Sequence, residues 1–393
     1  MHELPALNYD LLPLVASFTE SRRTLCAIML TCHDAYRFCP RLVLQQEAGL
    51  HGNKSIHRFL RFMRAEDHRR WQYLRSLRFG ETEFCVEMAQ RLAADLPRAT
   101  NLERLVFDDA EVTLNTADPS LRLALAALPN VKDLVIPVGH HAAAFLETIS
   151  WPLETAELLT DMHPEDDYWS QGPRELNYEW SAALLLKNAR ATLKSVTSHY
   201  GDDRAYVDFV LPVYPNVTRL VMTGHEVDYP AAAAWSRAFP NVRHLEVSTS
   251  LEAMHEYWAD GDIYDFAWRR ANSLAVMLRA GRWAELESYT GSLPDLYASG
   301  IAGRIRKISA KPLKQKHWKL FAAVVAQARP RELKLEFMAE VDYQRIPELL
   351  RSPGLEELVA LTLPVHIQLD PEGDVNPGLS DFIVRHALLI PAL

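Results

Sequence analysis

One short phrase recurs along this chain and constrains its fold more than any other feature. The stretch YPNVTRLVM at residues 214–222 returns as FPNVRHLEV at residues 239–247. Related phrases occur at four further places: WQYLRSLRF (71–79), TNLERLVF (100–107), LPNVKDLVI (128–136) and PGLEELVAL (353–361). Recurrence of one phrase at intervals of a few tens of residues is typical of a chain built from stacked units.

Each phrase carries three apolar anchors, spaced three and then two residues apart, as in Leu102, Leu105 and Phe107. The two-residue step between the last anchors is the period of a strand with one buried face. First anchors occur, with weaker copies included, at Leu74, Leu102, Val131, Leu153, Leu193, Val217, Val242, Leu286, Ile305, Leu333 and Leu355. The sequence therefore predicts about eleven strand-containing units.

Segments with helical spacing separate the strands. The clearest are AQRLAADL (89–96), PSLRLALAAL (119–128), YPAAAAWSRAF (229–239) and HWKLFAAVVAQA (317–328). Proline and asparagine often follow, because proline ends a helix and both residues favour turns. A single strand-plus-helix unit cannot bury its own apolar face, so stacked neighbours must reuse the same anchors.

This pattern resembles the leucine-rich repeat family. The resemblance implies an α/β fold, in which residues 71–393 form an irregular leucine-rich-repeat solenoid with a curved parallel sheet. The family's usual asparagine, three residues after the last strand anchor, is replaced by Ala110, Gly139, His225 and Ser250. We therefore expect no asparagine ladder to satisfy the loop backbone groups. An ordinary α/β domain with parallel strands is the alternative fold.

Residues 1–46 lack the repeat phrase and are predicted to form a separate three-helix unit, followed by a helical linker at 47–70. Two apolar faces have helical spacing: Leu11, Leu12, Val15 and Phe18 after an Asn8 cap, and Leu25, Ile28, Met29 and Cys32. A third helix is expected from about His33 toward Gln46, broken near Pro40. Pro13 is expected to shorten the first helix unless it falls in the first turn.

These residues also resemble an F-box, which docks a substrate receptor onto the Skp-type adaptor of a Skp-cullin-F-box ubiquitin ligase. The matching features are Leu4-Pro5, the Asp-Leu-Leu at 10–12, and the run from Leu25 through Thr31-Cys32-His33 to Tyr36. An F-box before irregular repeats resembles large fungal receptor families, as does the phrase at 281–301. The resemblance implies adaptor binding through Leu4, Pro5, Leu11, Leu12, Val15, Phe18, Leu25 and Met29.

The alternative interpretation of the N-terminal helices is that they only cap the solenoid, because end repeats must hide an apolar edge. The protein would then be a leucine-rich-repeat interaction scaffold unconnected to ubiquitin. In both cases the side chains between buried anchors point to the open face of the sheet, where their mixed charge suits a protein ligand. We predict target contacts at Arg104, Asp108, Arg219, Thr223, His244, Glu246, Lys307 and Lys334, and at Tyr168 and Trp169 of an insertion.

Charge and cysteine usage narrow the partners and the compartment. The net charge of −9, with no evident basic stripe, argues against nucleic acid. All four cysteines lie in the first quarter, so most of the chain has no means of forming a disulfide, which favours the cytosol or nucleus. No apolar run approaches the length of a membrane span, and we expect neither secretion nor membrane anchoring.

Candidate metal ligands are few. His140-His141 has no nearby carboxylate, and His163 with Glu165, Asp166 and Asp167 lacks a glycine-punctuated ligand loop. A metal-dependent enzyme using the His163 loop is a third hypothesis, and it predicts stoichiometric metal in the purified protein. No phosphate-binding glycine loop, nucleophile elbow or metalloprotease helix occurs. We expect no enzymatic activity, no cofactor and no metal.

Overall fold

The computed structural model describes most of the chain. The described residues are 11–81, 83–115, 118–160, 181–199, 211–223, 231–248, 267–268, 270–275, 283–301, 303–313, 317–337 and 346–363. They divide into two compact units, namely Met1–His163 with Leu185–Leu193, and Pro164–Leu184 with Lys194–Leu393. Each unit is described separately below.

Unit 1 begins with three helices: α1 (Leu11–Ser17), α2 (Arg22–Met29) and α3 (His33–Gln45). Local caps set two of the starts. The Ser21 hydroxyl accepts a hydrogen bond from the Thr24 amide at 3.3 Å, and the Cys32 thiol accepts one from Ala35 at 3.4 Å. The helices share a small core of Ala16, Leu25, Ala35, Cys39 and Val43. The three predicted helices are therefore present.

Pro40 behaves differently from the expectation, whereas Pro13 falls in the first turn of the described α1, the case in which it was expected to be tolerated. Pro40 does not break α3: it is buried inside the helix, where the packing of Ala35, Cys39 and Val43 offsets the missing backbone hydrogen bond. Pro13 is the third residue of the described α1, where an amide has no partner within those helical residues. The predicted Asn8 cap lies outside the described residues.

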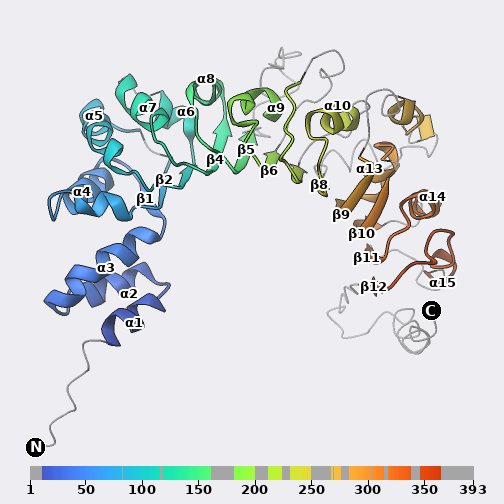
Figure 1. Ribbon diagram of the computed structural model, residues 1–393, viewed down its shortest axis with the longest axis horizontal. Helices are drawn as coiled ribbons and strands as arrows, with labels where there is room; N and C mark the ends of the chain where they lie inside the picture. The colour runs from blue at the N-terminus through green and yellow to red at the C-terminus, as the bar shows by residue number, and fades with distance from the viewer. Residues whose placement is uncertain are drawn as a thin grey trace, which may run out of the picture. The chain divides into compact units, whose positions relative to one another are not determined.

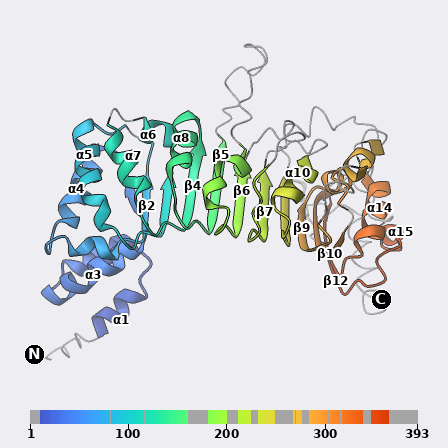
Figure 2. The same cartoon turned by 45° about the horizontal axis from the view of Figure 1, so that its top comes forward.

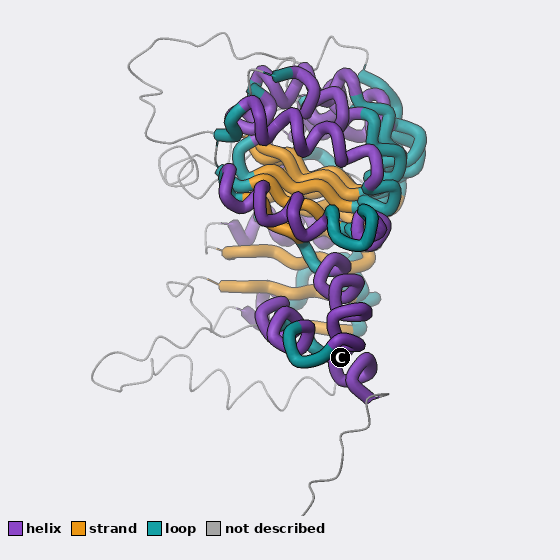
Figure 3. The backbone as a smooth tube through the Cα atoms, turned by 90° about the vertical axis from the view of Figure 1, so that its left-hand side faces the viewer, coloured by secondary structure: helices purple, strands orange, loops and turns teal. Residues whose placement is uncertain are grey.

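The repeats of unit 1 alternate strands with helical segments. In chain order they are β1 (Ala48–Leu50), α4 (Asn53–Met63), η1 (Arg69–Tyr73), β2 (Ser76–Phe79), α5 (Val86–Asp95), η2 (Leu96–Arg98), β3 (Arg104–Phe107), α6 (Ala110–Leu114), α7 (Pro119–Ala126), β4 (Asp133–Val138), α8 (His140–Thr148) and β5 (Thr155–Thr160). Figures 1 and 2 show these helices along one side of the strands, and Figure 3 views the same layering from the end of the row.

The segment predicted as a helical linker, 47–70, includes β1 and α4 and is the first repeat. Ala48 pairs with Leu77 of β2, in parallel. The prediction missed β1 because its sequence, AGL, offers a glycine and an alanine in place of two large anchors. The solenoid therefore begins earlier in the chain than residue 71.

Unit 2 continues the same alternation. Its elements are β6 (Ser195–His199), β7 (Arg219–Thr223), α10 (Ala231–Ala238), β8 (His244–Ser248), β9 (Glu285–Gly291), α13 (Leu293–Ala298), β10 (Arg304–Leu313), α14 (Trp318–Ala328), β11 (Glu332–Phe337), α15 (Ile346–Leu349) and β12 (Ala360–Thr362). The short segments α9 (Ala182–Leu185) and η4 (Lys187–Ala189) precede β6 in the chain. The four segments predicted to be helical correspond to α5, α7, α10 and α14.

Within each unit, strand order follows sequence order: β1 to β5 in unit 1, and β6 to β12 in unit 2. Each pairing described within unit 1 (β1 to β5) and within unit 2 (β6 to β12) is parallel. The predicted α/β fold, an irregular leucine-rich-repeat solenoid, is therefore confirmed, and the ordinary α/β domain is not what forms.

The anchors line up across the sheet and form the core. Leu77 pairs with Leu105, and Leu105 with Leu134, and all three are buried. Two residues further along the same strands, the rings of Phe79 and Phe107 stack with centroids 5.2 Å apart. Such repeated apolar columns are what allow one unit to bury the face of the next.

The register corrects the position of two weaker copies. Leu333 pairs with Ile308, the second anchor of the preceding repeat, so Leu333 is itself a second anchor. Leu361 pairs with Leu333, which makes Leu358, not Leu355, the first anchor of the last described repeat. The shift in the last repeat arises because Leu355, Leu358 and Leu361 lie three residues apart and fit the pattern equally well from sequence alone. At Leu333 the true first-anchor position is occupied by Pro330, which hid the start of the phrase.

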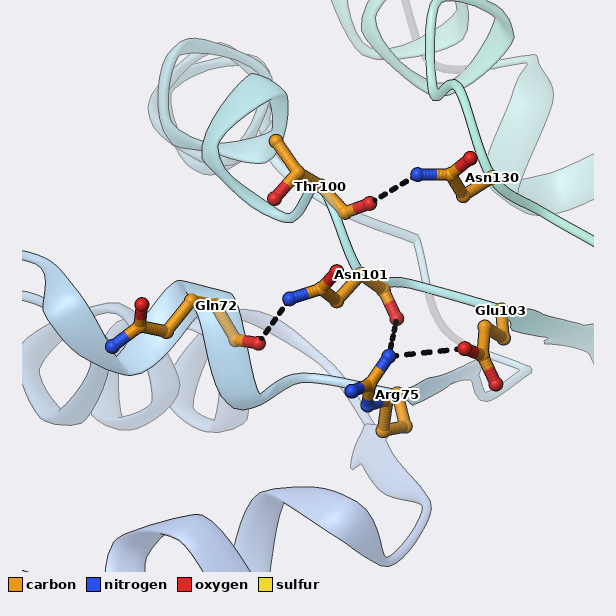
Figure 4. A network of polar contacts seen from close by, with 6 residues as sticks. All are labelled: Gln72, Arg75, Thr100, Asn101, Glu103 and Asn130. Atoms are coloured by element: carbon orange, nitrogen blue, oxygen red, sulfur yellow. Dashed lines mark hydrogen bonds and ion pairs between the residues drawn. The ribbon is translucent and has the colours of Figure 1, made fainter.

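Asparagine side chains join the corners of successive repeats (Figure 4). The Asn101 amide nitrogen donates to the Gln72 carbonyl oxygen at 2.8 Å, and the Asn130 amide nitrogen donates to the Thr100 carbonyl oxygen at 2.7 Å. Each asparagine thus satisfies the carbonyl that precedes the corresponding position one repeat earlier. Arg75 adds a hydrogen bond to the Asn101 carbonyl oxygen at 3.3 Å.

The expectation that this chain has no asparagine ladder was therefore wrong. Asparagine side chains do satisfy backbone carbonyls, but they lie just before strands β3 and β4 instead of after a strand. Unit 2 repeats the arrangement, with Asn241 donating to the Pro215 carbonyl oxygen at 2.7 Å. The signal was present in the sequence, because Asn101, Asn130 and Asn241 each precede a first anchor by one residue.

Changing Asn130 to Asp tests the ladder. The substitution keeps the shape of the side chain but replaces the donor with a carboxylate that faces the Thr100 carbonyl oxygen. We expect the free energy of unfolding to fall by about 1–3 kcal/mol, measured by urea denaturation. Gln72→Ala is the matched control, since it keeps the backbone carbonyl that Asn101 binds, and we expect a change within about 0.5 kcal/mol. Equal losses in the two variants would contradict the role of the ladder.

Candidate functional site

Helix α1 presents a stripe of large apolar side chains to solvent. Leu11, Leu14 and Val15 of α1, with Phe18 in the turn directly after it, follow the spacing i, i+3, i+4 and i+7, which places them along one side of the helix. Their exposed fractions range from 50% for Leu11 to 79% for Phe18. We call these four residues the apolar stripe. Folded proteins rarely leave such a cluster uncovered unless something binds it.

The rest of the helical unit orients this stripe. Ala16, on the other side of α1, is buried in the three-helix core. Past the end of α1, the Thr19 hydroxyl donates to the Val15 carbonyl oxygen at 3.2 Å. Leu30, which caps the end of α2, is also 79% exposed. The chain's own first repeat therefore does not cover the apolar stripe.

The predicted adaptor-binding residues differ in their exposure. Leu11, Val15 and Phe18 are exposed, and Leu12 is half-buried. Leu25 is only 1% exposed and belongs to the three-helix core, so the prediction that it contacts a partner needs correction: its place is structural.

Two further observations complete the comparison. Met29 is partly buried against the same core as Leu25, and Leu4 and Pro5 lie outside the described residues. Leu14 was missed by the sequence interpretation, although its three-residue spacing from Leu11 was a sufficient signal.

A buried arginine joins α3 to the first repeat. The Arg70 side chain is 1% exposed and lies over the rings of Tyr36, at 5.1 Å, and Phe62, at 4.3 Å. Its guanidinium also pairs with the Glu66 carboxylate at 2.8 Å. Cation–π contacts strengthen when they are removed from water. The helical unit is thus attached to the repeats through α3, while α1 carries the exposed stripe.

Three free cysteines line the interior of this helical unit. Burial raises the pKa of the Cys39 thiol, and the neighbouring Cys26 and Cys32 add to that rise. A thiol with a raised pKa is poorly reactive and packs as a small apolar group. Cys26 and Cys32 are partly buried against the same core, in agreement with the predicted place of Cys32 on an apolar face.

The open face of the sheet in unit 1 carries two of the predicted target-binding residues. Arg104 lies between Ser76 and Asp133 in register, is exposed, and makes no ion pair or side-chain hydrogen bond among the described residues. Asp108 pairs with Arg78 at 2.7 Å. The hydrogen bond and charge of Asp108 raise the pKa of the Arg78 guanidinium. Among the described strand residues of this face, Arg104 is therefore the cation available to a ligand.

In unit 2 the predicted residues lie on one face, and most of them contact polar side chains of neighbouring strands. Arg219 aligns with His244, and the Arg219 guanidinium lies 3.6 Å from the Glu246 carboxylate. The His244 ring also contacts the Ser288 hydroxyl at 2.9 Å. The Thr223 hydroxyl contacts the His199 ring.

Further along the same face, Lys307 pairs with Glu332 at 3.4 Å. Lys334 is half-buried on β11. Because exposed ion pairs contribute little stability, these side chains can exchange partners at small cost. Tyr168 and Trp169 lie outside the described residues.

The histidine pair at 140–141 begins helix α8. The Glu111 carboxylate from the preceding repeat accepts hydrogen bonds from the amides of His141, at 3.1 Å, and Ala142, at 3.0 Å. A carboxylate at a helix N-terminus is a favourable cap. Within the described ranges no group of three potential ligands is placed to hold a metal ion. The His163 loop lies outside those ranges.

These features define an α/β leucine-rich-repeat solenoid preceded by a three-helix unit with an exposed apolar stripe. No family model matches the chain, and no curated protein matches it. Among solved structures it is similar to the leucine-rich repeat-containing protein LegL7 from Legionella pneumophila, with 12% identity and a TM-score of 0.41 over 86% of this chain and 96% of that chain. No described helix is both long and apolar enough to span a membrane.

Proposed function

We propose that this chain is the substrate-receptor subunit of a Skp-cullin-F-box ubiquitin ligase, acting in the cytosol or nucleus. The observation that carries the proposal is the apolar stripe on α1. In this proposal the stripe binds a Skp-type adaptor and, through it, the cullin ligase. The repeats bind a target protein.

The energetics of the apolar stripe favour a protein partner. Burying one large apolar side chain contributes roughly 1.5–3 kcal/mol. Four such side chains on one face of α1 match a helix that lays its apolar face into a groove, a common mode of protein recognition. Leu30, at the end of α2, adds a fifth apolar group to the same small unit.

The second candidate function is an interaction scaffold with no link to ubiquitin, in which the N-terminal helices only cap the solenoid. The packing of Arg70 against Tyr36 favours a capping role for α3. A capping role does not explain why the apolar stripe is exposed, because the stripe does not contribute to the cap. The receptor function accounts for both features.

The target surface in this proposal is the open face of the sheet, including the unpaired Arg104. The receptor itself performs no chemistry. Its contribution to ubiquitination is proximity, because holding a target near a conjugating enzyme raises the effective concentration of the reacting groups.

Co-purification with a Skp-type adaptor tests the proposal. The double variant Val15→Asp/Phe18→Asp places two charges in the apolar stripe without disturbing buried residues. We expect the unchanged protein to recover the adaptor and the double variant to bind it at least about tenfold more weakly. The matched control is Leu123→Asp on α7, which alters an apolar side chain that is 63% exposed but lies in the repeats. This control should retain the adaptor.

Two results would overturn the receptor function. One is that the full-length protein recovers no adaptor. The other is that the double variant recovers as much adaptor as the Leu123→Asp control. Circular dichroism of both variants shows whether the fold is intact, since substitutions at exposed positions usually change stability by no more than about 0.5 kcal/mol.

A further inference from the structure

Helix α4 carries a second stripe with the same spacing as the first and the opposite chemistry. Lys54, His57, Arg58 and Arg61 occupy positions i, i+3, i+4 and i+7 and are all exposed. The helix sequence, NKSIHRFLRFM, contains no aspartate or glutamate. We call these four residues the basic stripe. From the sequence no basic stripe is expected in this chain, so the structure corrects that expectation.

No carboxylate in the part of the chain that the structure describes neutralises the basic stripe. None of its four side chains forms an ion pair or hydrogen bond among the described residues, whereas the neighbouring helix α5 pairs Glu87 with Arg91 at 2.6 Å. Other exposed arginines of unit 1, such as Arg75 and Arg78, also have carboxylate partners. The basic stripe is thus an uncompensated patch in a surface that otherwise pairs many of its charges.

Folding does not require these charges. The opposite face of α4 holds the helix in place, because Ile56, Phe59, Leu60 and Met63 are buried. Like charges four residues apart, as in Lys54 and Arg58, each destabilise a helix by about 0.2–0.5 kcal/mol. Lys54 also lies in the first turn, where the helix dipole disfavours a cation. The stripe therefore costs stability that the apolar face offsets.

The surrounding sequence concentrates positive charge in an acidic protein. Between Glu20 and Arg75 there are eleven lysines and arginines against five aspartates and glutamates, a net charge of +6, while the whole chain has −9. The remainder of the chain therefore has −15. Such an asymmetry within one chain is typical of a binding surface for an oppositely charged partner.

The place of α4 in the fold leaves the stripe accessible. Helix α4 stands at the end of the row of helices in unit 1, with α5 beside it (Figures 1 and 2). It belongs to the first repeat, next in the chain after the three-helix unit. A partner can therefore approach it without displacing another described repeat helix on that flank.

We infer that the basic stripe binds an acidic protein segment, a run of aspartate and glutamate side chains in a partner. The stripe spans eight residues, or about 10 Å along the helix, which matches a short carboxylate run. Proteins that bind nucleic acid commonly make roughly 6–10 phosphate contacts, whereas the stripe has four side chains. The acidic remainder of the chain would also repel the phosphates. A membrane surface fits poorly, because the apolar face of α4 is already buried. The inference does not depend on adaptor binding by the apolar stripe.

Fluorescence anisotropy with a labelled synthetic peptide of alternating Glu and Ser tests the inference on the full-length protein. The variant Lys54→Glu/Arg58→Glu/Arg61→Glu should bind the peptide at least about tenfold more weakly than the unchanged protein, and raising the salt concentration should weaken the binding of the unchanged protein. The matched control is Arg190→Glu/Arg237→Glu/Arg306→Glu, which changes net charge equally at three scattered exposed positions. This control should bind within about twofold of the unchanged protein.

Several results would overturn the inference: no peptide binding by the unchanged protein, equal loss in the scattered control, or equal affinity in the stripe variant. Tighter binding of a DNA duplex, or of phosphatidylserine vesicles, than of the peptide would assign the stripe to another class of partner and also reject the inference. Adaptor recovery by the stripe variant is measured in parallel. If it is unchanged while peptide binding is lost, the basic stripe acts separately from the proposed adaptor surface.

Discussion

Replacing Phe107 with Ala is expected to lower the free energy of unfolding by about 3–5 kcal/mol. Its ring is fully buried, stacks on Phe79 at 5.2 Å and meets the edge of Phe145 at 6.2 Å. The substitution removes the contact that joins the β2 and β3 repeats to α8. It leaves a cavity that a strand held on both sides cannot close. Guanidinium denaturation monitored by circular dichroism measures the change.

The matched control for Phe107→Ala is Val135→Ala. Val135 lies in the neighbouring strand β4 but is half-buried on the open face of the sheet. Its truncation removes fewer contacts, and we expect a loss of about 1 kcal/mol or less. Similar losses for the two variants would show that the stacked rings are not the centre of the core in unit 1.

Leu25→Ala and Phe18→Ala are expected to give opposite patterns, although the sequence groups both residues in one surface. Truncating Leu25 should destabilise the three-helix unit by about 2–5 kcal/mol, because the side chain is 1% exposed and lies in its core. Truncating Phe18, which is 79% exposed, should change stability by no more than about 0.5 kcal/mol. Under the proposed function, adaptor binding falls in both variants.

Hydrogen exchange separates the two causes. In Leu25→Ala, the amides of α2 and α3 should exchange faster while those of the repeats stay protected. In Phe18→Ala, protection should remain unchanged throughout both regions. Faster exchange of α2 and α3 in Phe18→Ala would mean that Phe18 supports the fold and does not belong to a binding surface.

The repeat architecture could be predicted because its signal is redundant. The anchors of Leu105 and Phe107 reappear in many copies, so one ambiguous copy does little harm. Prediction failed for copies whose own sequence is irregular or ambiguous. Strand β1 has a single large anchor in Leu50, and the leucine at 333 fits two registers. The pairing of neighbouring strands, which sequence spacing does not encode, resolves both.

The candidate site was only partly predictable for a related reason. Helical spacing identifies apolar faces at Val15 and at Leu25 equally well, but it does not say which face the unit uses for its own core. The packing of α1, α2 and α3 decides this, burying Leu25 and exposing Val15. The basic stripe of Lys54 and Arg58 was missed because an overall charge of −9 conceals a local excess of cations.

The backbone hydrogen bonds at the turn before a strand determine where the chain can accept insertions. Residues 243 and 287 are 44 positions apart, yet the amides of Glu287 and Ser288 donate to the Arg243 carbonyl oxygen at 2.8 and 3.0 Å. The amides of Glu154 and Thr155 make the same pair of bonds to Lys132 across only 22 positions. These backbone hydrogen bonds thus fix the spacing between adjacent repeats at the corner before the strand. New segments can therefore be inserted on the helical side without disturbing the repeats before and after them.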